Sequence, residues 1–227
     1  MKNIAESLDS LRSRIRRAEQ KFGRSPGSVR LIAVSKTRPT ADILEAMKNG
    51  QLEFGENYVQ EAVEKVQTIG NPDITWHFIG PVQSNKTGLI ARNFHWVHSI
   101  DRIKIARRLS DARPAQLPAL NICLQINIDD EAGKSGITPA EIPELLSACR
   151  ELPGLRVRGL MALPAPCNTF AEQRHSFHRV KTLVMQLRDK GEKLDILSMG
   201  TTNDYEAAIA EGANIIRVGT AIFGSRS

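Results

Sequence analysis

The stretch RLIAVSKT (residues 30–37), followed by TADILEAMKNG (residues 40–50), sets the pattern of the whole chain: a short apolar strand precedes an amphipathic helix. The alternation recurs, and strands are predicted at residues 30–37, 51–57, 75–80, 95–100, 120–128, 155–163, 194–200 and 214–224. A helix is predicted after each strand but the last, at residues 40–50, 58–70, 84–93, 101–112, 139–152, 170–191 and 204–212. This order is typical of a parallel sheet, and eight strands close a (β/α)8 barrel. An open doubly wound sheet is the alternative, which the regularity of the units disfavours.

Residues 1–23 precede the first unit and are predicted to form an extra N-terminal helix, with Ile4, Leu8, Leu11 and Ile15 along one stripe. This segment lacks the apolar core of a signal peptide, and no apolar run approaches the ~20 residues that span a bilayer. The fold class expected is therefore α/β, a single TIM-type barrel domain over residues 1–227, and the location expected is cytoplasmic.

Charge and cysteine content argue against several classes of function. The net charge is +6, but basic residues alternate with acidic ones, which favours a solvated surface over nucleic-acid binding. A mild positive field also suits an anionic ligand such as a phosphate ester. The cysteines (Cys123, Cys149 and Cys167) match no zinc or redox spacing, so neither a metal site nor a disulfide is expected.

Lys36 lies at the C-terminal end of the first predicted strand. Period-two alternation places it on the same face as Ile32 and Val34, which would point into a barrel. Burial lowers the pKa of an amine and makes it nucleophilic, as Schiff-base formation with an aldehyde requires. A lysine that extends to solvent from the strand end fits the position equally well.

Arg217 is a cation within the otherwise apolar last strand, NIIRVGTAIFG (residues 214–224). A buried guanidinium requires a partner, which could be an inward carboxylate or a heteroatom of a ligand. The position alone leaves both interpretations open.

The last two strands run into SMGTTND (residues 198–204) and VGTAIFG (residues 218–224), where glycine stands beside hydroxyl residues. Barrel enzymes often bind phosphate at the loops after strands seven and eight, and glycine lets backbone N–H groups approach a ligand. Alternatively, Thr202 or Asn203 caps the helix that begins near Asp204.

Three other polar residues have two interpretations each. Asn57 either caps the following helix or reaches the mouth of the barrel. His77 fits a hydrogen-bonded core residue better than a catalytic group, and Lys134 is either a solvated loop lysine or a second basic group at the mouth.

Several motifs occur together in a fixed order: AVSKT (33–37), FGENYVQE (54–61), WHFIGPVQSNK (76–86), INI (126–128) with KSGI (134–137), RGLMALP (158–164), LSMG (197–200) and IRVGTAIFG (216–224). Over essentially the whole chain, this set resembles the pyridoxal 5′-phosphate (PLP) homeostasis (YggS-type) protein family. The resemblance implies the fold of the alanine racemase N-terminal domain, a PLP-binding barrel. It also implies a role in vitamin B6 and amino-acid balance without established catalytic turnover.

The same resemblance implies roles for individual residues. Lys36 matches the lysine that holds PLP as a Schiff base, Asn57 lies near the cofactor, and Arg217 faces the pyridine nitrogen. The phosphate turns depart from the family at GTTND (200–204), where Thr202 keeps a hydroxyl in place of the family's serine and both Thr201 and Asn203 are altered. The cofactor-binding residues expected are Lys36, Asn57, Ser198, Gly200, Thr201, Thr202, Arg217, Gly219 and Thr220.

An arginine cannot protonate the pyridine nitrogen, so the ring is a weaker electron sink. Racemases of this fold take a tyrosine base from a further domain, whereas the tyrosines here are Tyr58 and Tyr205. We expect a non-catalytic, monomeric PLP-binding protein with PLP-dependent apoenzymes as recipients and no membrane or nucleic-acid partner. A PLP-dependent amino-acid racemase of low activity is the alternative, and a nucleic-acid-binding module is a third hypothesis.

Overall fold

The computed structural model describes residues 3–129 and 133–225. Within them, parallel strands pair in chain order and close into a barrel, since β8 pairs with β1. The strands are β1 (Arg30–Val34), β2 (Glu53–Glu56), β3 (Thr75–Phe78), β4 (Trp96–Ile100), β5 (Leu120–Ile126), β6 (Leu155–Ala162), β7 (Ile196–Ser198) and β8 (Ile215–Val218). The predicted eight-stranded barrel is confirmed. Part of the predicted loop at residues 129–136 lies outside the described residues.

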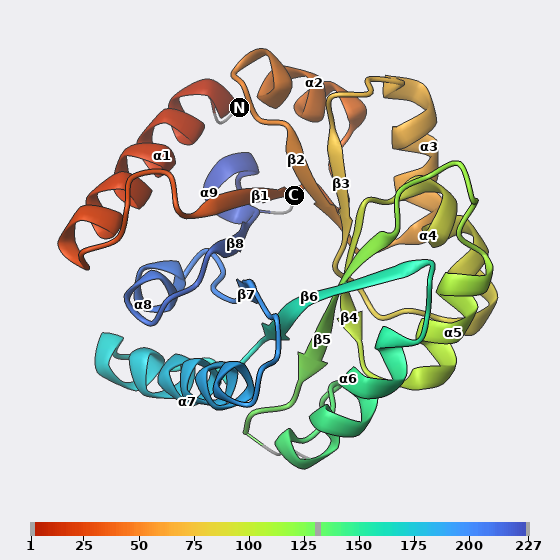
Figure 1. Ribbon diagram of the computed structural model, residues 1–227. Helices are drawn as coiled ribbons and strands as arrows, with labels where there is room; N and C mark the ends of the chain where they lie inside the picture. Colours follow the sequence, from red (N-terminus) through yellow and green to blue (C-terminus); the bar gives the residue numbers. More distant parts are fainter. Residues whose placement is uncertain (1–2, 130–132, 226–227) are drawn as a thin grey trace.

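Helices form a ring around the barrel (Figure 1). They are α1 (Ile4–Lys21), α2 (Thr40–Lys48), α3 (Val59–Ile69), α4 (Thr87–Asn93), α5 (Ile103–Asp111), α6 (Ile142–Arg150), α7 (Phe170–Asp189), α8 (Tyr205–Ala210) and α9 (Thr220–Phe223). Short 3-10 turns, η1 (Ser84–Lys86) and η2 (Pro139–Glu141), precede α4 and α6.

The prediction that no helix follows the last strand is wrong. The segment predicted as one strand, residues 214–224, divides into β8 and the short helix α9. Ile222 and Phe223 are buried in that helix, which packs against α1. A short apolar run does not by itself distinguish a strand from a buried helix, and this one contains both.

The extra N-terminal helix is confirmed as α1, whose buried stripe includes Leu8, Leu11 and Ile15. It begins after Asn3, whose side chain accepts a hydrogen bond from the backbone N–H of Glu6. The helix packs against α2, α8 and α9, outside β1 (Figure 1). It therefore covers the part of the barrel wall where the first and last strands meet.

The barrel has two apolar layers. Strands and helices enclose a large outer core, and a small cluster fills the barrel interior, made of Ile32, Trp96, Cys123, Met161, Ile196 and Ile215. Cys123 is fully buried there, and burial raises the pKa of its thiol to about 12, which agrees with its predicted role as a core residue. Closure pairs Ile32 with Arg217 in the β1–β8 register. The C-terminal ends of β7, β8, β1 and β2 are consequently neighbours.

Candidate functional site

The predicted site residues lie at the C-terminal ends of those neighbouring strands, where barrel enzymes place their sites. Lys36 follows β1 by two residues and is half-buried. Asn57 comes directly after β2 and Gly219 directly after β8. Barrel closure therefore brings together, at one end, residues that are far apart in the sequence.

Side chains of α3 form hydrogen bonds with the backbone of the residues before and after Lys36. Thr37, the next residue, has a φ of 61°, in the left-handed region that is unfavourable for a threonine. Its N–H donates a 2.6 Å hydrogen bond to Glu61 Oε1, and Lys65 Nζ donates a 2.8 Å bond to the carbonyl of Ser35. These contacts from α3 stabilise a turn that the local sequence alone would not favour.

Lys65 and Glu56 form a buried ion pair behind this turn. Lys65 Nζ lies 2.8 Å from Glu56 Oε1 and 2.5 Å from Glu61 Oε1, and the hydroxyl of Ser35 donates to Glu56 Oε1. Burial raises the pKa of Glu56, although the Lys65 ammonium acts to lower it. Sequence reasoning missed this cluster, because Glu61 and Lys65 stand four residues apart on a helix, a spacing typical of exposed pairs.

Asn57 is not a helix cap, since Tyr58 precedes α3 without a side-chain capping bond. Asn57 Oδ1 is buried and lacks a hydrogen-bond partner within the described residues. The backbone of Asn57 is packed closely as well, since a Cβ added at Gly80 would lie 2.3 Å from its carbonyl oxygen. A buried polar oxygen without a partner is costly, which fits a residue that meets a ligand.

Arg217 lies inside the barrel and is only 4% exposed. Its Nη1 donates a 2.6 Å hydrogen bond to Ser198 Oγ, and its Nη2 donates to the carbonyl of Ala162 at 3.1 Å. Burial lowers the pKa of the guanidinium to about 10, so it stays protonated at neutral pH. The sequence left open whether Arg217 pairs with an inward carboxylate or with a ligand. Its hydrogen bonds within the protein go to a hydroxyl and a carbonyl group, and not to a carboxylate.

The two predicted phosphate turns differ in how they are held. Gly200 has a φ of 95°, and a Cβ there would lie 2.6 Å from the Cβ of Ala208, so only glycine fits. The N–H and the hydroxyl of Thr201 both donate to Asp204 Oδ1. The residue that precedes α8 is therefore Asp204, and not Thr202 or Asn203; its side chain holds the turn and makes no capping bond to the helix.

The second turn runs from Gly219 into α9, which begins at Thr220. A Cβ at Gly219 would lie 3.1 Å from the carbonyl oxygen of Val34, so the β8 end approaches the β1 end closely. This turn therefore lies beside the strand that leads to Lys36.

Of the residues with two interpretations, His77 is a buried core residue hydrogen-bonded to His98, and Lys134 is exposed in the loop after β5. The described residues bring together no group of three or more His, Cys, Asp or Glu side chains that could bind a metal ion. In the same part of the chain, no helix is both long and apolar enough to cross a lipid bilayer.

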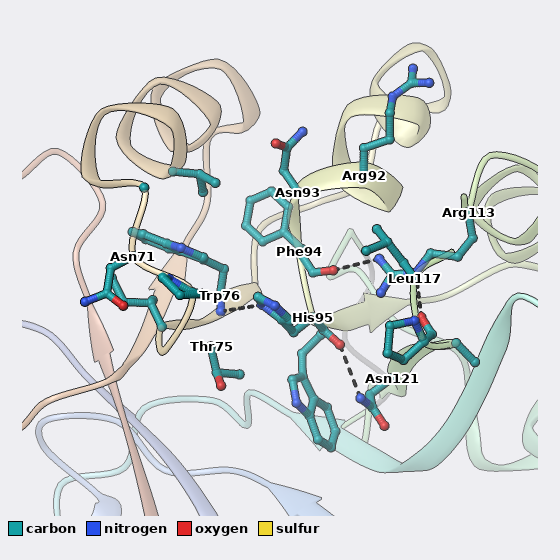
Figure 2. A pocket seen from close by; sticks show the side chains of 17 residues that line it. Asn71, Thr75, Trp76, Arg92, Asn93, Phe94, His95, Arg113, Leu117 and Asn121 are labelled. Carbon is teal, nitrogen blue, oxygen red and sulfur yellow. Dashed lines mark hydrogen bonds between the residues drawn. The ribbon is translucent and has the colours of Figure 1, made fainter. Parts of the chain in front are cut away.

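A pocket of about 630 Å³ opens at the opposite end of the barrel, where β3, β4 and β5 begin. Figure 2 shows that several of its polar groups are hydrogen-bonded within the protein itself. The ring of His95 accepts from the Trp76 N–H, Asn121 donates to the His95 carbonyl, and Arg113 donates to the carbonyl of Phe94. We therefore place the candidate site at the C-terminal end and not in this pocket.

Comparison with known proteins gives a consistent result. Residues 7–227 match the family described as "Alanine racemase, N-terminal domain". The chain is 52% identical over its full length to a pyridoxal phosphate homeostasis protein of Pseudomonas aeruginosa, of which it covers 97%, and 50% identical to the protein of that name from Escherichia coli K12, of which it covers 98%. It also resembles PipY of Synechococcus elongatus, solved with PLP bound, with a TM-score of 0.85 and 39% identity over 97% of this chain and 100% of that chain.

Proposed function

Because this chain belongs to the alanine racemase N-terminal domain family, and within it to the pyridoxal phosphate homeostasis proteins, we propose that it binds PLP at the C-terminal end of its barrel. Lys36 would hold the cofactor as a Schiff base, with loss of water between its amine and the aldehyde. The protein's role would be to keep PLP available in the cell and not to turn over an amino acid.

The observation that carries the proposal is the arrangement of a half-buried lysine and a buried arginine at the ends of the paired strands β1 and β8. When bound, PLP supplies a reactive aldehyde and an electron-withdrawing ring. Arg217 offers a fixed, protonated donor to a ring heteroatom. Asn57 supplies a buried oxygen that still requires a donor, and a ligand that reaches it would complete its hydrogen bonding.

The phosphate group would lie at the turns after β7 and β8. Gly200 and Gly219 let the backbone approach it, while Thr202 and Thr220 bring hydroxyl groups to this region. Ser198, whose hydroxyl lies between Arg217 and His98, would act on the cofactor through Arg217. The N–H and the hydroxyl of Thr201 both bond to Asp204, so Thr201 would support the turn and not bind the phosphate itself. The donor set, made of hydroxyl groups and backbone amides at strand ends, suits a phosphate monoester.

Two features argue against a two-base racemase. Tyr205 is buried, and burial raises the pKa of its hydroxyl to about 12, which makes it a poor base at neutral pH. Tyr58 is 51% exposed and therefore in contact with water. We therefore propose a non-catalytic carrier, acting as a monomer in the cytoplasm, with PLP-dependent apoenzymes as recipients.

Titration of the apoprotein with PLP, followed by absorption and equilibrium dialysis, tests the proposal. We expect stoichiometric binding with a new visible band. Lys36→Ala should lose that band and bind PLP more weakly. Some affinity should persist, because the phosphate contacts remain. Lys48→Ala, at an exposed lysine on α2, serves as the matched control. Absence of PLP binding by the wild type, or a Lys36→Ala protein identical to it, would contradict the proposal.

The carrier role has its own test. The PLP-loaded protein is mixed with a PLP-dependent apoenzyme, and recovery of the enzyme's activity is followed. Separately, the loaded protein is incubated with single L-amino acids. Formation of a D-isomer above the Lys36→Ala background would favour the racemase alternative.

A further inference from the structure

A chain of hydrogen bonds leads from Arg217 into the middle of the barrel. Arg217 Nη1 donates to Ser198 Oγ at 2.6 Å, and Ser198 Oγ lies 2.9 Å from His98 Nδ1. His98 Nε2 in turn lies 3.0 Å from His77 Nδ1. All four side chains are buried, with at most 4% of any residue exposed.

The chain continues to the opposite end of the barrel. His77 Nε2 faces Glu53 Oε2 at 3.3 Å, a close contact that lacks hydrogen-bond geometry, and Glu53 is held by Arg30 through bonds of 3.0 and 2.7 Å. Arg30 and Glu53 are the first residues of β1 and β2, whereas Ser198 is the last residue of β7. The hydrogen bonds and this contact together connect the cofactor end of the barrel with its N-terminal end.

The bonding pattern allows one arrangement of the protons. A carboxylate only accepts, so His77 Nε2, which faces Glu53, carries the proton of that ring. His77 Nδ1 then accepts from the Nε2–H of His98, and His98 Nδ1 accepts from the hydroxyl of Ser198. The same hydroxyl accepts from Arg217, whose guanidinium only donates. The opposite tautomer of either ring would bring two N–H groups or two lone pairs together.

The electrostatics agree with neutral rings. Burial lowers the pKa of His77 and lowers that of His98 well below its ordinary value, with Arg217 and Arg30 adding to the effect on His98. Burial alone would raise the pKa of Glu53, but contacts with His77 and Arg30 lower it to about 2. A charged carboxylate and two neutral imidazoles are therefore the stable states at neutral pH.

The ring of Trp96 packs against both histidines. The rings of His77 and Trp96 are stacked at 5.7 Å between centroids, and the Trp96 ring also lies 5.8 Å from that of His98. The guanidinium groups of Arg30 and Arg158 lie over Trp96 at 5.2 and 5.0 Å. The hydrogen-bonded chain is thus enclosed, which strengthens each bond because the surroundings have a low dielectric constant.

We propose that His98 and His77 are positioning residues, which hold Arg217 through Ser198 in one orientation and connect its guanidinium to the carboxylate of Glu53. The direct partners of Arg217 are a hydroxyl and a carbonyl, both neutral, so the polarised histidine pair supplies the link to a counter-charge. The role of these hydrogen-bonded residues in placing Arg217 against the PLP ring rests on the proposed function, but the proton arrangement does not.

The proton arrangement is tested on the apoprotein by nitrogen-15 NMR of the histidine side chains. We expect His77 and His98 each to show a protonated Nε2 and an unprotonated Nδ1 at about pH 7. Exposed His175 provides an internal reference in the same spectra. A proton on Nδ1 of either ring, or a doubly protonated ring, would overturn the inference, whether or not the protein binds PLP.

The positioning role is tested with variants of His98 loaded with PLP. His98→Phe removes both bonds and should shift the absorption maximum and weaken binding about tenfold, the effect of about one lost hydrogen bond. His98→Asn keeps an acceptor for Ser198 and should stay nearer to the wild type. Met161→Ala is the control, a cavity in the same interior cluster that makes no bond in the chain.

The outcomes separate the two claims. Equal absorption spectra for PLP-loaded His98→Phe and Met161→Ala would show that His98 has only a structural role, and would overturn the positioning role. Failure of the wild type to bind PLP, with the expected tautomers present, would instead contradict the proposed function alone.

Discussion

Lys65 Nζ donates a 2.8 Å hydrogen bond to the carbonyl oxygen of Ser35, the residue immediately before Lys36. Through this bond, helix α3 determines where strand β1 ends and how the chain continues into the turn at Thr37. The position of Lys36, the proposed cofactor lysine, therefore depends on a second lysine that is buried outside the barrel interior.

Replacing Lys65 by methionine should lower the free energy of unfolding by about 3–5 kcal/mol, because it leaves the buried carboxylate of Glu56 without its partner. Denaturant titration measures this change. Lys48→Met, at an exposed pair with Glu45, should change stability by no more than about 0.5 kcal/mol. A Lys65→Met protein as stable as Lys48→Met would show that the cluster does not hold the turn.

Adding a methyl group at Gly200 should disturb the proposed phosphate turn. Gly200→Ala forces an alanine into a left-handed conformation and places its Cβ 2.6 Å from that of Ala208. Gly212 has nearly the same φ, 96°, but open space around it, so Gly212→Ala isolates the conformational cost of about 1–2 kcal/mol.

Overpacking at Gly200 should add about 1–3 kcal/mol to that cost and should weaken PLP binding, whereas Gly212→Ala should leave binding unchanged. Thermal unfolding and PLP titration of both variants measure the two effects. Equal PLP affinities in the two variants would argue against a phosphate at this turn.

The folded-state pKa of Glu53, about 2, lies below its ordinary value of 4.5. Because the folded state favours the ionised carboxylate, its contribution is present above about pH 4.5 and is lost as the pH falls towards 2. The stability difference between wild type and Glu53→Gln should therefore shrink over that range, by up to about 3 kcal/mol. Unfolding measured at a series of pH values checks this, and a difference independent of pH would contradict the contacts with His77 and Arg30.

Replacing Arg217 by glutamate should shift the absorption maximum of bound PLP, because a carboxyl group can share a proton with the ring nitrogen and a guanidinium cannot. Arg217→Lys keeps the charge without the planar fork and should shift it less. Absorption spectra of the loaded variants measure the effect. If Arg217→Glu left the maximum in place, Arg217 would not face the ring.

The sequence predicted the barrel well because its strands and helices follow regular periods. The alternation in residues 30–37 correctly separated inward Ile32 from outward Ala33, which belong to different apolar clusters in the structure. Prediction failed at residues 220–223, where an apolar run continues past the strand and the chain turns into a helix. Local periodicity carries no information about where such a run leaves the sheet.

The site was predictable only in part. Lys36 and Arg217 stand out because a charge in an apolar strand requires an explanation. Lys65 and His98 do not stand out, since burial of the first depends on how α3 packs and the partner of the second comes from another strand. Such contacts arise from the three-dimensional arrangement of the barrel, which a single sequence does not specify residue by residue.

The most direct test of the proposed cofactor site is borohydride reduction of the PLP-loaded protein, followed by peptide mapping by mass spectrometry. We predict that reduction fixes the cofactor on the peptide that contains Lys36, and that Lys36→Ala carries no label there. Label on another lysine, or no covalent adduct with the loaded wild type, would contradict the assignment of Lys36 as the anchor.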